Sequence, residues 1–213
     1  MSDAEFSSPD APVAPEAATP ARKRPKPGER RVQILEALAT MLEQPGADRI
    51  TTAALAARLD VSEAALYRHF ASKAQMFEGL IEFIEQSVFT LINQIAEREI
   101  EGQAQAARIV AMLVQFAEKN PGMTRVMVGD ALVFENERLQ QRMNQFFDKI
   151  ESTLKQSLRV AADGDGSATP SLDAQVRASM LTAFVIGRLQ RFARSGFKRA
   201  PSEHLEASLA RML

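Results

Sequence analysis

Residues 51–73 read TTAALAARLDVSEAALYRHFASK and contain two short helical patterns separated by a tight break, followed directly by a third helix start. Leu55 and Leu59 recur at a spacing of four and give the first helix an apolar face, and a threonine at its start can accept free backbone N–H groups. Leu66 and Phe70 bury the second helix in the same way. Two short helices joined by a tight turn are typical of helix-turn-helix DNA readers.

The break and the helix starts have matching polar residues. Asp60 tolerates the left-handed conformation that glycine usually supplies at such a turn. Ser62 is expected to cap the second helix. Ser72 and Gln75 have the capping-box spacing, so a further helix should begin at Lys73. The Lys73 side chain and the free N–H groups of that helix could then receive a phosphate.

The exposed positions of the second helix suit a close approach to DNA. Ala64 leaves room for the duplex, whereas Tyr67 and His69 carry polar tips that can reach phosphates or base edges. Arg68 can serve DNA or pair within its own domain. The predicted DNA-binding residues are Arg30, Arg31, Thr51, Thr52, Ser62, Ala64, Tyr67, Arg68, His69 and Lys73.

The run from Ile50 to Lys73, centred on VSEAALYRHF at 61–70, resembles the DNA-binding domain of the TetR repressor family. LIEFIE at 80–85, NPGMTR at 120–125 and RFARSGFK at 191–198 resemble the branch of that family that acts in nucleoid occlusion. The resemblance implies an all-α, TetR-like fold with a three-helix helix-turn-helix domain and a larger helical dimerisation and regulatory domain. It also implies a homodimer on near-palindromic double-stranded DNA, whose half-sites lie about 34 Å apart.

The composition is that of a compact intracellular protein. The 213 residues can hold one small and one medium domain, and the absence of cysteine excludes disulfides and thiolate metal sites. No apolar run is long enough to cross a bilayer, so we expect a cytoplasmic protein. The resemblance implies that it associates with the nucleoid. The net charge of −1 does not exclude DNA binding, because the local field attracts DNA.

The first 28 residues differ from the rest of the chain. Six of the ten prolines fall between Pro9 and Pro27, and basic residues crowd between Arg22 and Arg31. We expect residues 1–28 to form a disordered arm with a basic end. Such an arm can follow phosphates or enter a minor groove, and the alternative is a solubilising tail.

Two folded domains are expected after the arm, at 29–71 and 72–213. The predicted helices lie at about 29–44, 72–97, 103–120, 121–128, 137–160, 171–194 and from 201 or 202 to the end, with a flexible loop at 161–170. Asp163 and Asp165 do not make a calcium loop, because Ala174 stands where an EF-hand needs glutamate.

The last long helix carries an apolar face. In the TetR family the last two long helices pair with those of a second subunit. The predicted dimerisation residues are Leu181, Phe184, Val185, Leu189 and Phe192. The alternative is that Phe184 and Phe192 only fill the core of the monomer.

The helix expected at 72–97 is apolar on more than one side. Phe83 lies about 120° from the centre of the main apolar stripe, and Phe89 lies about as far on the other side. Such a helix is either sandwiched between layers or offers a binding surface. The resemblance favours a surface, because in the nucleoid occlusion branch a groove on the helices near Ser72 and Gln103 receives the C-terminal tail of the division protein FtsZ.

The resemblance places this groove at Phe83, Met112, Gln115 and Lys119. An aromatic ring and a methionine suit the apolar side chains of an extended peptide, and a lysine suits its acidic groups. Leu91 stands where a basic residue is expected. Part of the charge complementarity is therefore absent or comes from Arg108 or Lys119.

Catalytic and metal-binding motifs are missing from the sequence. Its two histidines, His69 and His204, lie far apart and have no cysteine partner, so we expect neither an enzyme nor a cofactor. The first hypothesis, implied by the resemblance, is a nucleoid occlusion factor that binds FtsZ when on DNA and antagonises the division ring. The second is a ligand-responsive TetR-type repressor. A third, a helical adaptor that does not touch DNA, leaves residues 51–73 unexplained.

Overall fold

The computed structural model describes residues 28–44, 49–164, 166 and 168–213, and the regular secondary structure in these residues is helical. The predicted arm therefore lies outside the described residues, except for Gly28. The elements are α1 (Glu29–Leu42), α2 (Thr52–Arg58), α3 (Glu63–Tyr67), α4 (Lys73–Arg98), α5 (Gly102–Lys119), α6 (Pro121–Met127), the 3₁₀ turn η1 (Asp130–Leu132), α7 (Glu137–Gly164), α8 (Pro170–Arg194) and α9 (Leu205–Met212). None of these helices is long and apolar enough to cross a membrane.

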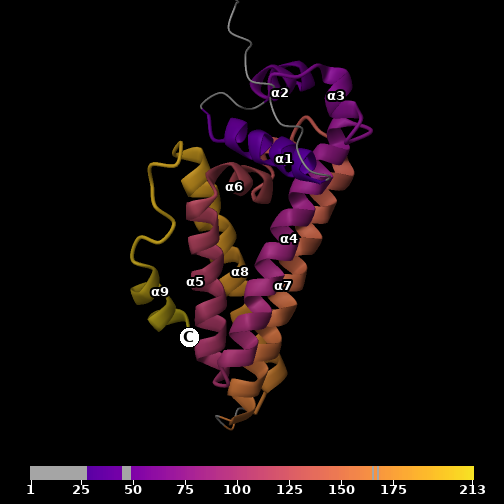
Figure 1. The fold of residues 1–213 in the computed structure, drawn as a ribbon. Coiled ribbons are helices and arrows are strands. Elements are labelled where there is room, and N and C mark those ends of the chain that lie inside the picture. Colours follow the sequence, from indigo (N-terminus) through magenta and orange to yellow (C-terminus); the bar gives the residue numbers. More distant parts are fainter. Residues whose placement is uncertain (1–27, 45–48, 165, 167) are drawn as a thin grey trace, which may run out of the picture.

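Helices α1 to α3 form a small unit at one end of the molecule (Figure 1). Thr51 caps α2 by accepting the Ala54 N–H at 3.1 Å, and Ser62 caps α3 by accepting the Ala65 N–H at 3.3 Å. Asp60 adopts the left-handed conformation with φ of 54°. These features confirm the predicted helix-turn-helix, because each short helix has a capped start and the turn has the residue that it needs.

The long helices α4, α5, α7 and α8 form most of the rest of the described chain, and the short elements α6, η1 and α9 pack around them (Figure 1). Helices α4 and α7 run away from the helix-turn-helix, and α5 and α8 run back towards it. Buried residues form one continuous apolar core from Ile34 in α1 to Leu209 in α9. The small unit therefore shares its core with the bundle instead of being tethered to it.

Gly122 brings the bundle close to the helix-turn-helix unit. A Cβ atom at this position would lie 1.9 Å from the Ala39 carbonyl oxygen of α1, so only glycine allows α6 to pack so closely. Thr124, fully buried, donates its hydroxyl to the Ala117 carbonyl at 2.7 Å and fixes the turn from α5 into α6. Residues 120–124 thus seat α1 on α6.

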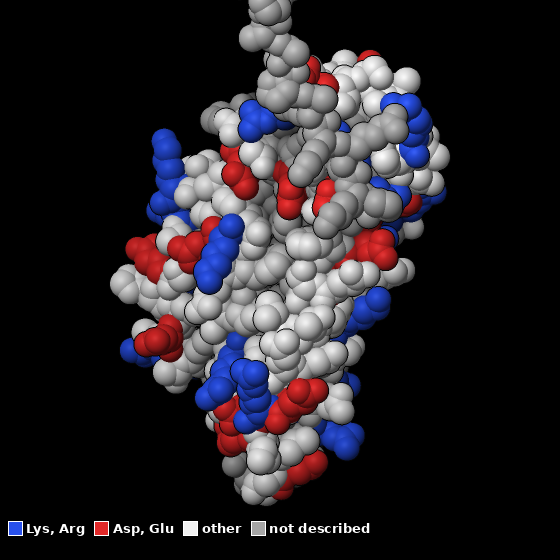
Figure 2. Space-filling view, viewed as in Figure 1, with Lys and Arg blue, Asp and Glu red and all other residues white. Residues whose placement is uncertain are grey.

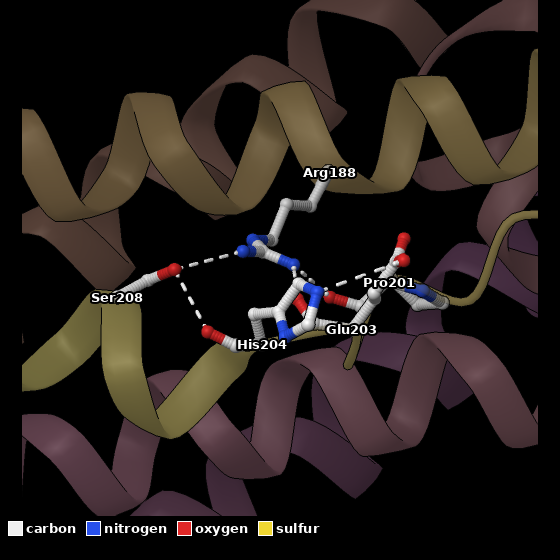
Figure 3. A network of polar contacts seen from close by, with 5 residues as sticks. All are labelled: Arg188, Pro201, Glu203, His204 and Ser208. Atoms are coloured by element: carbon white, nitrogen blue, oxygen red, sulfur yellow. Dashed lines mark hydrogen bonds and ion pairs between the residues drawn. The ribbon is translucent and has the colours of Figure 1, made fainter.

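Arg188 of α8 makes several polar contacts with the C-terminal segment (Figure 3). The Arg188 guanidinium donates to the carbonyl oxygens of Pro201 at 2.8 Å and Glu203 at 2.6 Å, and to the Ser208 hydroxyl at 3.0 Å. Its carbon Cζ lies 4.4 Å from the centre of the Phe184 ring. Burial, and then the nearby Arg191, lower the pKa of Arg188, so neighbouring carbonyl groups take the place of bulk water around this cation.

Some helix boundaries differ from the prediction. Helix α7 continues to Gly164, so the first four residues of the predicted 161–170 loop are helical; Ala162 is buried, and its packing extends the helix. Helix α1 ends at Leu42, not at residue 44. Helix α9 begins at Leu205 because His204, with φ of 53°, is left-handed and interrupts any earlier start.

Candidate nucleic-acid interface and partner groove

Helix α3 presents its outer side to solvent. Ala64, Tyr67 and Arg68 are exposed, and His69 is half-buried, whereas Leu66 on the inner side is buried. Figure 2 shows basic side chains on the part of the surface that belongs to this end of the molecule. The small, polar and basic residues predicted to face DNA therefore share one accessible surface.

Three side chains at this surface form a polar cluster between α2 and α3. The Thr52 hydroxyl donates to the Glu63 carboxylate at 2.5 Å, and the Tyr67 hydroxyl lies 3.4 Å from the Thr52 oxygen. Both Thr52 and Tyr67 were predicted to bind DNA, whereas Glu63 was not. The cluster fixes the angle between the two short helices and holds the tyrosine ring over the start of α2.

Arg31 has a structural contact that the sequence did not reveal. Its guanidinium donates to the His69 carbonyl at 2.6 Å and lies 4.2 Å from the centre of the Phe70 ring. Cation–π stacking of this kind stabilises packing even at a partly exposed site. Arg31 therefore ties α1 to the end of α3, and Arg30 beside it is half-buried.

Lys73, the first residue of α4, pairs with a residue far along the chain. Its ammonium contacts the Glu135 carboxylate at 2.5 Å, and the two side chains are 27% and 10% exposed. The phosphate contact predicted for Lys73 stays a prediction. The capping box at this helix start is modified: Ser72 accepts the Gln75 N–H, but the Gln75 side chain accepts from Ala71.

The four predicted groove residues lie on α4 and α5, two helices that pack against each other. Phe83 is 48% exposed and Leu91, two turns further along, is exposed as well, although most apolar residues of α4 are buried. On α5, Gln115 and Lys119 are exposed and Met112 is half-buried. Figure 2 shows a broad uncharged area over α4 and α5 in the middle of the view. The two packed helices therefore offer an apolar strip with a lysine near one end.

The opposite side of α4 packs against α7. Phe89 meets Phe146 edge-to-face with ring centres 5.7 Å apart. The Glu85 carboxylate accepts two hydrogen bonds from the Arg142 guanidinium, at 2.6 and 3.3 Å. This hydrogen bonding raises the pKa of Arg142. The sequence had left two interpretations of a helix with two apolar sides; in the structure Phe89 is half-buried against α7, and Phe83 is exposed.

The assignment of the five dimerisation residues is wrong for most of them. Leu181, Val185, Leu189 and Phe192 are buried within the chain's own core, and Phe184 is half-buried against Arg188. The alternative, that the phenylalanines fill the core of the monomer, holds for Phe192. Periodicity detected the apolar face of α8 but could not show that this face belongs to the same subunit.

A second apolar stripe runs along the outer side of α8. Leu172, Val176 and Met180 recur every four residues and are half exposed or more. Ala183 continues the stripe, and at Gly187 the space around the missing Cβ is open. An apolar row of this kind on a long helix is unusual for a surface that stays in water.

Two family models match the chain. One, described as bacterial regulatory proteins of the tetR family, covers residues 34–80; the other, described as the tetracyclin repressor-like C-terminal domain of SlmA-like proteins, covers residues 101–212. Nucleoid occlusion factor SlmA of Aliivibrio fischeri is 52% identical over 181 residues, which cover 84% of this chain and 92% of that relative. The SlmA of Vibrio cholerae is 51% identical over 178 residues, which cover 83% and 90%.

The chain belongs to the SlmA family of TetR-type regulators. Solved structures agree on the fold: the fatty acid degradation regulator FadR from Bacillus halodurans has a TM-score of 0.71 at 14% identity and covers 89% of this chain and 97% of its own. The TetR family regulator PfmR from Thermus thermophilus has a TM-score of 0.68 at 18% identity, with 86% and 95% covered. The SlmA-family assignment makes the protein a DNA-binding regulator and not an enzyme.

Several contacts in this SlmA-family chain could not be predicted from its sequence. Glu63, Arg31 and Glu135 each bind a residue that was predicted to face DNA or to lie beside it. The pairs lie 11, 38 and 62 residues apart, so no helical periodicity connects them. A signal existed only for the outer stripe of α8, whose spacing of four is visible in the sequence.

Proposed function

We propose that this protein is a nucleoid occlusion factor. It binds near-palindromic DNA as a dimer, engages the C-terminal tail of FtsZ while on DNA, and opposes assembly of the division ring over the nucleoid. The observation that carries the proposal is the large exposed aromatic side chain of Phe83 on a helix whose other apolar residues are mostly buried. The names of its relatives give the process in which such a surface would act.

The DNA-binding part of the proposal uses the outer side of α3 and the starts of α2 and α4. Tyr67 and His69 reach phosphates or base edges, and Ala64 allows close approach. Thr51 and Ser62 act through the helix starts that they cap, since free N–H groups there attract phosphates. Arg31 contributes by holding α3 in place.

The partner-binding part of the proposal uses the strip between α4 and α5. Phe83 and Met112 receive apolar side chains of an extended tail, Gln115 offers hydrogen bonds, and Lys119 pairs with an acidic group. Arg108 already forms an ion pair with Glu99, since its Nε lies 2.9 Å from a Glu99 oxygen. Lys119 is therefore the groove's main cation in this proposal.

The dimer forms, in this proposal, through the outer stripe of α8. Leu172, Val176 and Met180 pack against the same stripe of a second copy, as an isologous interface requires. Met180→Glu should weaken the dimer at least about a hundredfold, because two-fold symmetry buries the new charge twice. Phe134→Glu is the control, since Phe134 is also exposed but lies outside the stripe. Sedimentation equilibrium measures both, and equal dimer constants would remove α8 as the interface.

FtsZ sedimentation tests the function as a whole. Polymers are pelleted with the protein alone and with the protein plus a duplex that it has selected from a randomised pool. DNA-enhanced loss of polymer supports the proposal. Undiminished polymer together with normal DNA binding would leave the ligand-responsive repressor as the better function.

The repressor alternative has one structural feature in its favour. A surface hollow of about 510 Å³ lies between α4, the start of α5 and the end of α7, with Phe89, Ile92 and Val160 in its lining. The buried polar side chains in the described part of the chain are Thr124, Ser157 and Thr182. Of these, Ser157 lines the hollow together with Asn93, Gln105 and Thr153, so its lining combines apolar and polar side chains as a small-molecule pocket usually does.

A further inference from the structure

Glu135 lies outside the helix-turn-helix in sequence but next to it in space. Its nearly buried carboxylate accepts a hydrogen bond from the Lys73 ammonium at 2.5 Å. The same ammonium lies 5.7 Å from the centre of the Phe77 ring. A carboxylate of the larger domain therefore holds the cation at the end of α4 that adjoins the DNA-binding unit.

Glu135 is held more firmly than Lys73. Its backbone N–H donates to the Leu132 carbonyl at 3.0 Å, which anchors it to η1. Directly after it, α7 is fixed to α4 by two further ion pairs, Arg138 with Glu78 at 2.6 Å and Arg142 with Glu85 at 2.6 Å. Lys73 has four rotatable side-chain bonds and a compact charge, so it can move between partners while Glu135 stays in place.

The three ion pairs differ in polarity. In the pairs of Arg138 and Arg142, α4 supplies the carboxylate and α7 the cation, and both pairs lie farther from the helix-turn-helix along α4. In the first pair α4 supplies the cation, at the helix start where a phosphate is favoured. Of the three pairs, only Lys73–Glu135 has its cation at a place where DNA can compete for it. When this pair breaks, the other two still hold α7 against α4.

We infer that Glu135 competes with DNA phosphates for Lys73 and thereby limits the affinity of the protein for DNA. The inference rests on the proposed phosphate contact of Lys73. It assigns to the larger domain a residue that sets how available a DNA-contacting side chain is. Loss of the carboxylate frees the ammonium without altering α2 or α3.

The test is a double-mutant cycle on DNA binding. Fluorescence anisotropy with the selected duplex at several salt concentrations gives the dissociation constants of wild type, Glu135→Gln, Lys73→Gln and the double variant. Glu135→Gln should bind more tightly by about two- to fivefold for each subunit of the dimer, the range expected when a partly exposed ion pair is removed. The gain should vanish in the Lys73→Gln background. Lys73→Gln alone should lower the slope of log K against log salt by about 1.8, the value for one phosphate contact from each subunit of the dimer.

Glu78→Gln is the matched control. It removes one carboxylate from the same α4–α7 contact but does not touch Lys73, so it reports the effect of net charge alone. The inference fails when Glu135→Gln tightens binding no more than Glu78→Gln does, or when its gain persists without Lys73. An unchanged salt slope in Lys73→Gln would instead remove the phosphate contact itself, and wild type that selects no duplex would contradict DNA binding.

A second variant covers the outcome in which Glu135→Gln loses helicity by circular dichroism. Glu135→Asp keeps the charge but withdraws it from the ammonium by one methylene. Its affinity should lie between wild type and the value expected for the glutamine variant. Affinity at or below the wild-type value would overturn the inference.

Discussion

Helix α4 has two sides that use the same kinds of residue in opposite ways. Towards α7, Phe89 packs on Phe146 and Glu85 is paired with Arg142. On the side away from α7, Phe83 is 48% exposed in the uncharged strip. One side is thus satisfied within the chain, and the other leaves an apolar side chain in water at a cost in free energy. Because of this difference, substitutions on the α7 side should change the stability of the protein, and substitutions on the exposed side should change the binding of a partner.

The largest effect is expected from Phe89→Ala. The half-buried ring and its edge-to-face contact are lost, so the free energy of unfolding should fall by about 2–3 kcal/mol, somewhat less than for a fully buried phenylalanine. Urea unfolding followed by circular dichroism measures this change. Affinity for an FtsZ tail peptide, measured on the folded protein, should stay within about twofold of wild type. A large loss of affinity would show that the two sides are not independent.

Phe83→Ala should give the reverse pattern. Tail-peptide affinity should fall about tenfold or more, as for an aromatic anchor at the centre of an interface. The free energy of unfolding should change by less than about 0.5 kcal/mol, because this side chain has few contacts within the chain. Fluorescence binding of the peptide and the same urea experiment provide both numbers. Unchanged affinity would remove Phe83 from the groove, and strong destabilisation would make it a core residue.

The smallest effect is expected from Arg142→Ala. The pair with Glu85 is partly exposed, so its loss should lower the free energy of unfolding by less than about 1 kcal/mol. Because the pKa of Arg142 is raised in the folded protein, its contribution to stability is complete below the pKa of the unfolded chain and is lost only as the pH rises through the folded pKa. The difference between variant and wild type in thermal unfolding should therefore be constant from about pH 6 to pH 9. A difference that changes in this range would assign the stabilisation to another titrating group.

Local features of the fold could be predicted from the sequence. Thr51, Asp60 and Ser62 act on atoms within a few residues of themselves, so their caps and turn follow from residue type and spacing. The same holds for Phe83 and Phe89 of α4, because a helical projection places both of them outside the main apolar stripe. These features depend on interactions between residues that are close together in the sequence, so residue type and spacing are enough to predict them.

Long-range pairings could not be predicted in this way. α8 has apolar residues on two sides, and the sequence does not say which side meets its own core; Leu181 and Val185 were assigned to the wrong one. Nor can spacing show that Glu135 reaches Lys73, since that contact depends on how α7 lies beside α4. The sequence likewise could not show that Arg31, a predicted DNA-binding residue, contacts His69 and Phe70.

The close packing of α6 on α1 at Gly122 has a consequence for the coupling between the two proposed binding sites. Helix α5 carries three of the proposed groove residues and continues through Asn120 into α6, so packed helices join the proposed tail site to the DNA-reading unit. Binding free energies at two coupled sites obey reciprocity: any factor by which DNA strengthens tail binding is also the factor by which the tail strengthens DNA binding. Under the proposed function, an FtsZ filament that presents many tails would then raise the occupancy of the protein on its chromosomal sites, so the target would help to retain its own inhibitor.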